Sequence, residues 1–192
     1  MDFHLNSEQR AFADAVGKFA EKELAPGALE RAHSPEYPWA IAQKISEQGL
    51  LGIAFPEKDG GMGGTLMDAV IAIQEVAMHC PKSADVVQAG NFGAIRTFVE
   101  YASEAQKEKY LPDLLAGKKI LGLGMSEPGA GSAVTELATS AKKVDGGYLI
   151  NGSKVFSTHS PEAGLFLVYV RFGPGLDGIG SVLVERDAPG LD

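Results

Sequence analysis

The stretch that decides the fold is residues 121–159, which begins L-G-L-G-M-S-E-P-G-A-G-S and ends I-N-G-S-K-V-F-S-T-H. Each of these two end sequences reads as a loop that follows apolar residues typical of β-strands. A polar hairpin sequence separates the two loops. Glycines let a main chain come close to a ligand because they lack a Cβ. The loops also carry Ser126, Ser132, Phe156, Ser157 and Thr158. Such a set suits a flat ring with polar edges, as in a flavin, better than a metal ion or a nucleophilic triad.

Short β-rich runs extend outward from this stretch and begin at about Lys118. They are residues 120–125, 138–144, 147–150, 154–158, 165–172 and 181–185. Asp145-Gly146 between two runs predicts a tight hairpin. The pattern predicts a small β-barrel or sandwich. Leu183 and Val184 indicate an edge that lacks a partner, so we expect an incomplete β domain in a fragment of something longer.

Helical periodicity dominates the residues before this point. Apolar spacing and capping residues predict helices at about 8–24 after Ser7, from Pro38 to Gly49, after Thr65 to before Pro81, at 83–101, and from Ser103 to near Tyr110. The helix after Thr65 is expected to bury Leu66, Val70, Ile73 and Ala77. The sequence therefore predicts an α+β fold, with an N-terminal helical bundle domain over residues 1–117 and a β domain over 118–192.

Composition limits the function classes. The 192 residues are 45% hydrophobic and 22% charged, which are ordinary values for a packed protein. The net charge of −8 argues against nucleic-acid binding, because phosphates need gathered Lys and Arg. The single cysteine, Cys80, cannot form an internal disulfide, which argues against a secreted disulfide scaffold.

Targeting and membrane signals are not visible. The first ten residues lack a basic leader followed by an apolar run. No apolar stretch approaches the roughly 18–20 residues that span a membrane. We therefore expect a protein of the cytoplasm, or of a compartment like the mitochondrial matrix, that is not secreted.

The sequence does not support several other kinds of catalytic or cofactor site. Gly129-Ala130-Gly131 is half of a dinucleotide fingerprint, but a β segment follows where that fingerprint needs a helix. No histidines have the spacing of a helical zinc pair, and no G-x-S-x-G elbow exists for a serine triad. Glu127 could act as a general base, although a carboxylate beside a rigid proline turn more commonly fixes backbone geometry.

At these loops the chain resembles the acyl-CoA dehydrogenase family of flavoproteins. Residues 122–132, G-L-G-M-S-E-P-G-A-G-S, contain the S/T-E-P-x-x-G-S of its signature, and residues 150–158 match I-N-G-x-K-x-W/F-I/S-T/S. The segments L-N-S-E-Q-R, G-I-A-F-P-E and E-A-Q-K-E-K-Y-L-P-D-L-L-A-G-K-K-I also follow the family order. The family fold has an N-terminal helical domain, a middle β domain and a C-terminal helical domain. This chain matches the first and most of the second.

The resemblance implies FAD as cofactor and an acyl-CoA thioester as substrate, with α,β-dehydrogenation and hydride transfer to the flavin N5. Carried over by residue, Met125 and Ser126 would lie along the pyrimidine edge. Ser132 would contact the flavin phosphate or the CoA, and thus also the substrate. Phe156 would lie beside the isoalloxazine, and Thr158, with Ser157 next to it, would approach N5.

The family also implies an electron-transfer flavoprotein as electron acceptor and a homodimer or homotetramer. Ala133 and Phe156 depart from the usual residues, a carboxylate or amide and a tryptophan. The family's catalytic glutamate lies in the C-terminal helical domain, which is not in this sequence, so we name no catalytic base. Two alternatives stay open: a non-catalytic binding or assembly module, and a related flavoprotein of the oxidase, monooxygenase or desulfinase type.

Overall fold

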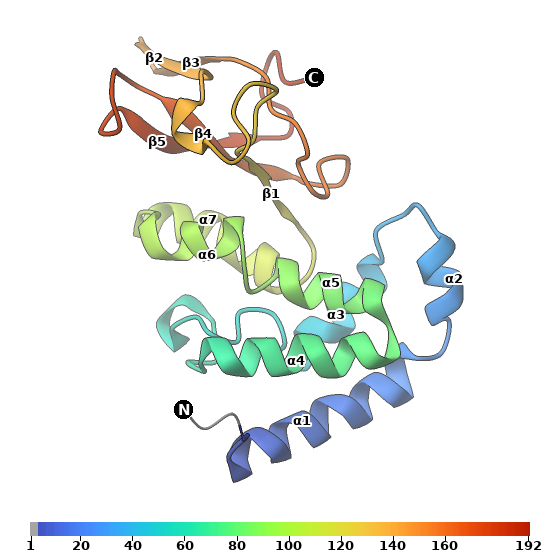
Figure 1. The fold of residues 1–192 in the computed structure, drawn as a ribbon. Coiled ribbons are helices and arrows are strands. Elements are labelled where there is room, and N and C mark those ends of the chain that lie inside the picture. The colour runs from blue at the N-terminus through green and yellow to red at the C-terminus, as the bar shows by residue number, and fades with distance from the viewer. Residues whose placement is uncertain (1–3) are drawn as a thin grey trace. The chain divides into compact units, whose positions relative to one another are not determined.

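The computed structural model describes residues 4–192. It divides into two compact units, a helical one over Met1–Lys119 and a second over Ile120–Asp192 that holds a mixed β-sheet (Figure 1). The α+β class predicted from the sequence is confirmed. None of the helices in the described part of the chain has the length and apolarity that crossing a membrane takes.

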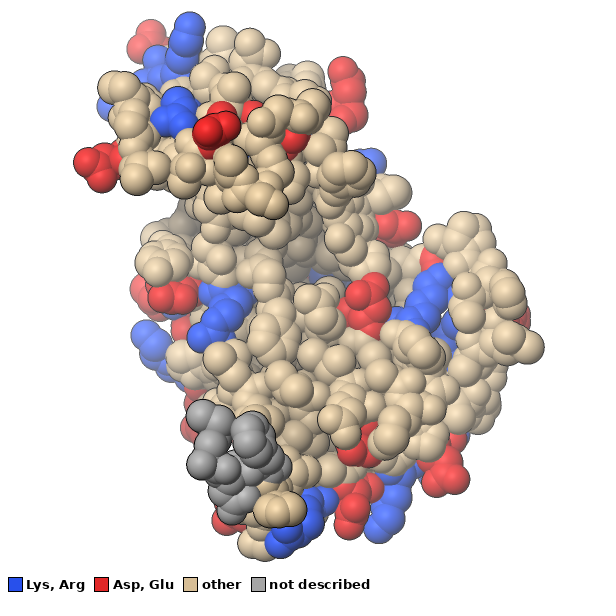
Figure 2. All heavy atoms as spheres, in the orientation of Figure 1, with Lys and Arg blue, Asp and Glu red and all other residues tan. Residues whose placement is uncertain are grey.

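The helical unit is built mainly from α-helices joined by short connections. In order they are α1 Ser7–Phe19, the π-helix η1 Ala20–Leu24, α2 Ala28–His33, α3 Trp39–Glu47, the 3-10 helix η2 Glu57–Asp59, α4 Leu66–His79, α5 Pro81–Ala89, α6 Ala94–Tyr101 and α7 Glu104–Leu115. On the face that Figure 2 shows, acidic and basic side chains of this unit are interspersed.

Capping boxes start several of these helices. Thr65 and Ser103 cap α4 and α7 as predicted, each paired with the side chain three residues on. The prediction of Ser7 as the first cap was wrong by one residue. Asn6 is the cap, since its side chain accepts from the Gln9 N–H at 2.8 Å and the Gln9 side chain accepts from the Asn6 N–H.

The prediction for the buried face of α4 was wrong in part. Leu66 and Val70 are 44% and 47% exposed, whereas Ala69, Ala72 and Val76 are fully buried. α4 packs against α1 and α5. The alanines at this contact let the helices approach closely, and the stripe that faces the core is Ala69, Ala72 and Val76 rather than the predicted one.

The predicted helix at 83–101 is two helices. The chain breaks between α5 and α6, where Gly93 has φ +69°. Asn91 in the break is fully buried, accepts from the Ile53 N–H at 2.7 Å and donates to the carbonyls of Leu50 and Val87 at 2.9 and 2.8 Å. The bond to the Val87 carbonyl replaces one that a continuous helix would provide, and the other two give partners to backbone groups of the segment at residues 50–53.

Helix α7 also runs further than predicted. It continues past Pro112 to Leu115, and the Pro112 carbonyl accepts from the Ala116 N–H at 3.0 Å. A proline in the last turn removes a single hydrogen bond of its own, which the rest of the helix tolerates. The short helix α2 was not predicted.

The second unit is a five-stranded sheet, with β1 Leu121–Gly124, β2 Ser140–Val144, β3 Gly147–Asn151, β4 Leu165–Arg171 and β5 Ile179–Glu185. β4 is central. β5 pairs antiparallel along all of it, while β1 and β2 pair parallel with its first and last parts. The β2–β3 hairpin closes over Asp145-Gly146 as predicted.

The predictions for the strands have different outcomes. Residues 154–158 do not form a strand, because Phe156 adopts φ +57°, outside the extended range. Leu165, Phe166 and Leu167 are all buried, so the start of β4 is covered on both faces as predicted. Within residues 4–192, β5 pairs with β4 alone, which leaves the edge predicted at Leu183 and Val184 without a strand neighbour.

Candidate functional site

The first loop leaves β1 at Gly124 and carries Met125 and Ser126, both half-buried. It then closes a tight turn in which the N–H groups of Glu127 and Ala130 each donate to the other residue's carbonyl at 3.1 Å. A Cβ added at Gly129 or Gly131 would meet nothing within 4 Å. The turn is therefore held by its own backbone, and its glycine side stays open.

The second loop follows β3 and is held in an unusual conformation. Phe156 and His159 both adopt left-handed backbone angles, φ +57° and +56°, which are uncommon for residues other than glycine. Phe156 is 94% exposed, Ser157 is half-buried and Thr158 is exposed. Strain of this kind persists only where the surrounding structure fixes it, and here it presents an aromatic ring to the outside.

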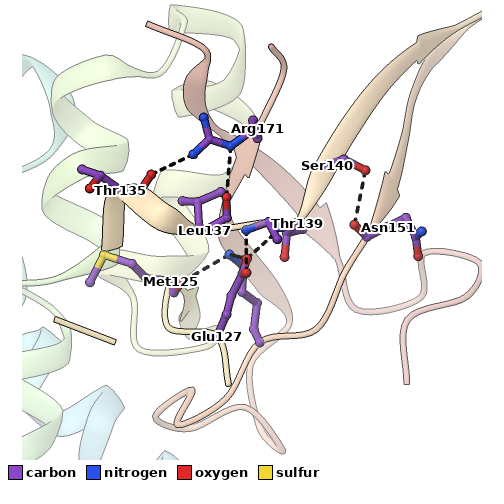
Figure 3. Close-up of polar contacts among 10 residues, drawn as sticks. Met125, Glu127, Thr135, Leu137, Thr139, Ser140, Asn151 and Arg171 are labelled. Atoms are coloured by element: carbon purple, nitrogen blue, oxygen red, sulfur yellow. Dashed lines mark hydrogen bonds and ion pairs between the residues drawn. The ribbon is translucent and has the colours of Figure 1, made fainter. Parts of the chain in front are cut away.

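Glu127 joins the two loops (Figure 3). Its buried carboxylate accepts from the backbone N–H groups of Ala138 at 2.7 Å and Thr139 at 2.9 Å. The Lys154 ammonium donates to the same carboxylate at 2.7 Å and to the Met125 carbonyl at 3.2 Å. One buried ion pair thus links the end of β1, the entry to β2 and the second loop.

A backbone hydrogen bond lies next to this ion pair. The Val155 N–H donates to the Ser126 carbonyl at 2.9 Å. Gly152 lets the second loop approach the entry to β2, since a Cβ there would clash with Thr139. The loop containing Ser126 and the loop containing Phe156 therefore lie side by side.

The charge state of Glu127 decides between the roles that the sequence left open. Burial raises the pKa of this carboxyl, but hydrogen bonds from the Ala138 N–H, from Lys154 and from Thr139 outweigh it and lower the pKa to about 2. Glu127 is thus ionised at neutral pH, with both oxygens occupied by donors. Such a group is a poor proton acceptor, so the geometry favours a role in fixing the backbone over one as general base.

The structure brings most of the predicted site residues together. Met125 and Ser126 accept hydrogen bonds from Lys154 and Val155, which directly precede residues 156–158. Ser132 is exposed beyond the turn, and no hydrogen bond within residues 4–192 links its side chain to the second loop. In the same described range, the N–H groups of Ser126 and of residues 156–158 donate no hydrogen bond to another backbone group.

Lys154 and its pairing with Glu127 were not predicted. The sequence did carry a signal for it, since the first motif contains an acidic residue and the second a basic one. However, 27 residues separate the two positions, and local spacing does not reveal a pairing at that distance. Among residues 4–192, no three His, Cys, Asp or Glu side chains lie together as metal ligands would.

Comparisons with known proteins match both units. The model "Acyl-CoA dehydrogenase, N-terminal domain" matches residues 6–118, and "Acyl-CoA dehydrogenase, middle domain" matches residues 122–192. An acyl-CoA dehydrogenase of Bacillus subtilis is 32% identical over 190 residues, which cover 98% of this chain and 50% of that protein.

Solved structures share the fold. The FAD complex of PigA superposes with a TM-score of 0.90 at 26% identity and covers 99% of this chain and 51% of its own. A structure described as the electron transferring flavoprotein of Acidaminococcus fermentans gives a TM-score of 0.87 at 32% identity over 99% of this chain and 50% of its own. The chain spans about half the length of the curated relatives it matches.

Proposed function

Since the chain belongs to the acyl-CoA dehydrogenase family, we propose that it forms the N-terminal and middle part of an FAD-dependent acyl-CoA dehydrogenase. The reaction would remove one hydrogen from each of the α and β carbons of an acyl-CoA thioester and yield the α,β-enoyl-CoA. The observation that carries the proposal is the pair of adjoining loops, 125–132 and 156–158, in a chain that matches both family domains. The PigA structure, described as an FAD complex, supports the cofactor.

The residues of the two loops fit a flavin ring. A flavin has a broad flat face and a polar edge of nitrogen and oxygen atoms. Phe156 offers an aromatic face that is 94% exposed and can cover such a ring. Ser126 and Thr158 offer hydroxyls, and the backbone N–H groups beside them are not taken up by other backbone groups in the described chain. A donor set of this kind matches the polar edge.

In the proposed site each loop has its own task. Bound FAD would supply the hydride acceptor. Met125 and Ser126 would line the pyrimidine edge, and Thr158, next to Ser157, would donate toward the N5 edge. One preorganised donor of this type is worth about 3–4 kcal/mol in the transition state, a rate factor of about 10²–10³. Phe156 would exclude water from the ring face, and Ser132 would contact the flavin phosphate or the CoA.

We assign no residue of this chain as the base that removes the α-proton. Glu127 is excluded by its bonding, because its carboxylate is buried and its oxygens already accept from the Ala138 N–H, the Thr139 N–H and Lys154. We further propose an electron-transfer flavoprotein as electron acceptor, which the Acidaminococcus fermentans structure supports. A homodimer or homotetramer in the cytoplasm or in a matrix-like compartment completes the proposal.

Anaerobic spectroscopy tests this function. We expect the protein isolated from its natural source to show the visible absorbance band of oxidised flavin. We expect its acyl-CoA substrate to bleach this band. A series of straight and branched acyl-CoA thioesters would identify the substrate class. Hydrogen peroxide formed rapidly in air would instead indicate the oxidase type. A colourless protein that binds no FAD would contradict the proposal and favour the non-catalytic module.

A further inference from the structure

The Glu127–Lys154 ion pair is almost fully enclosed. The two side chains are 8% and 12% exposed, and their charged atoms lie 2.7 Å apart. A buried charge is costly unless each of its polar atoms has a partner. Both members of this pair have further partners, so the pair is stable only while several backbone segments keep their places.

Those backbone segments are the ones that carry the proposed flavin contacts. Lys154 donates to the carbonyl of Met125, and Glu127 directly follows Ser126 in sequence. On the other side, Phe156 lies two residues after Lys154. A shift in the ion pair therefore moves the two loops relative to each other, and it acts on the residues that would meet the ring.

The second loop also needs an external support. Phe156 and His159 hold left-handed backbone angles that their side chains disfavour. The carbonyl of His159 accepts from the N–H groups of Glu162 and Ala163, which fixes the far end of this loop. Its near end is fixed by the contacts of Lys154 and Val155 with the first loop.

We propose that Glu127 and Lys154 are positioning residues for the flavin, whose ion pair sets the spacing between Ser126 on one loop and residues 156–158 on the other. The inference rests on the proposed function and deepens it. Neither side chain touches the reacting atoms in this account. Each acts through the backbone that it holds, so the two should behave as one unit when they are substituted.

A second buried ion pair provides a matched control. Asp59 and Lys107 lie 3.2 Å apart with side chains 5% and 11% exposed, nearly the same burial as the first pair. They belong to the helical unit, where Lys107 donates to both oxygens of Asp59 and also pairs with Glu104, so this pair is separate from Glu127 and Lys154. Loss of this pair measures what any broken buried ion pair does to stability.

The test compares Lys154→Met, Glu127→Gln, the double variant, Lys154→Arg and the control Lys107→Met in the flavoprotein as isolated. FAD is removed and titrated back, and the dissociation constant, the visible spectrum and the reduction potential of bound FAD are measured. We expect Lys154→Met and Glu127→Gln each to raise the FAD dissociation constant roughly 10- to 100-fold, and the double variant to be no worse than either single one.

The controls separate positioning from general stability. Lys107→Met should lower the melting temperature by a similar amount but keep the FAD dissociation constant within about twofold. Lys154→Arg keeps the charge and should restore most of the affinity and the native spectrum. If Lys154→Met does not fold, the Lys154→Arg and Glu127→Gln pair decides, since only the charge-keeping variant should retain the wild-type spectrum and potential.

Two results would overturn the inference while the proposed function stands. One is wild-type affinity, spectrum and potential in both Glu127→Gln and Lys154→Met. The other is an equal loss of FAD affinity in Lys107→Met, which would assign the effect to stability alone. A wild-type protein that binds no FAD would overturn the proposed function and this inference together.

Discussion

Asn91 in the helical unit and Glu127 in the β unit both link distant backbone segments, but they do so with different chemistry. Each is a buried polar side chain that ties together segments distant in sequence. Asn91 does so as a neutral amide that both donates and accepts. Glu127 can only accept when ionised, so it needs N–H groups and the ammonium of Lys154. The hydrogen bonds of Asn91 therefore do not change with pH, whereas those of Glu127 depend on its ionisation.

The largest expected effect is in the helical unit. Asn91→Ala leaves the Ile53 N–H and the carbonyls of Leu50 and Val87 without their partner in the core. We expect a loss of about 4–5 kcal/mol in the free energy of unfolding, because each buried unsatisfied group costs about 1–3 kcal/mol. Denaturant unfolding checks this, with Asn151→Ala at an exposed position as control. An effect of Asn91→Ala below about 1 kcal/mol would contradict the account.

The next effect is the pH dependence of the β unit. The folded pKa of Glu127, about 2, lies below its ordinary value of 4.5. The resulting stability is fully present above pH 4.5 and is lost as the pH falls toward 2. Its size is about 3 kcal/mol, since one pKa unit corresponds to 1.36 kcal/mol.

Glu127→Gln should remove this component of the pH dependence. We expect the difference in unfolding free energy between wild type and this variant to be about 3 kcal/mol at pH 7 and to shrink between pH 4.5 and 2. Urea titrations across that range measure it. Asn91→Ala should show a constant difference over the same range, and a constant difference for Glu127→Gln would contradict the charge-based account.

A smaller effect concerns the strain at the second loop. Phe156→Gly removes a ring that is 94% exposed and relieves a left-handed backbone angle. We expect the free energy of unfolding to stay the same or rise by up to about 1 kcal/mol, since relief of strain is partly offset by the flexibility of glycine when unfolded. Affinity for FAD should fall by roughly 2- to 12-fold as the stacking partner is lost. A clear loss of stability would show that the ring packs within the chain.

Local signals predicted much of this fold. The caps at Thr65 and Ser103 and the hairpin at Asp145-Gly146 depend on residues within a few positions of each other, and all are present. The buried face of α4 was not predicted correctly, because that helix has apolar residues nearly all round and periodicity alone does not select one stripe. The break at Asn91 depends on partners about 40 residues away.

The candidate site divides in the same way. The glycine turns and hydroxyls of the two loops were visible in sequence. The left-handed angles of Phe156 and His159, and the ion pair that joins the loops, are not encoded in local spacing. The ion pair depends on the entry to β2, which brings the backbone N–H groups of Ala138 and Thr139 to the Glu127 carboxylate.

The reduction potential of bound FAD in Thr158→Val tests directly whether these loops line the N5 edge of a flavin. Valine keeps the shape of threonine and removes its hydroxyl. We predict a potential more negative by roughly 30–60 mV, because a hydrogen bond to a charged group is worth about 1.5–3 kcal/mol and 30 mV corresponds to about 1.4 kcal/mol for two electrons. An unchanged potential in a variant that still binds FAD would contradict it.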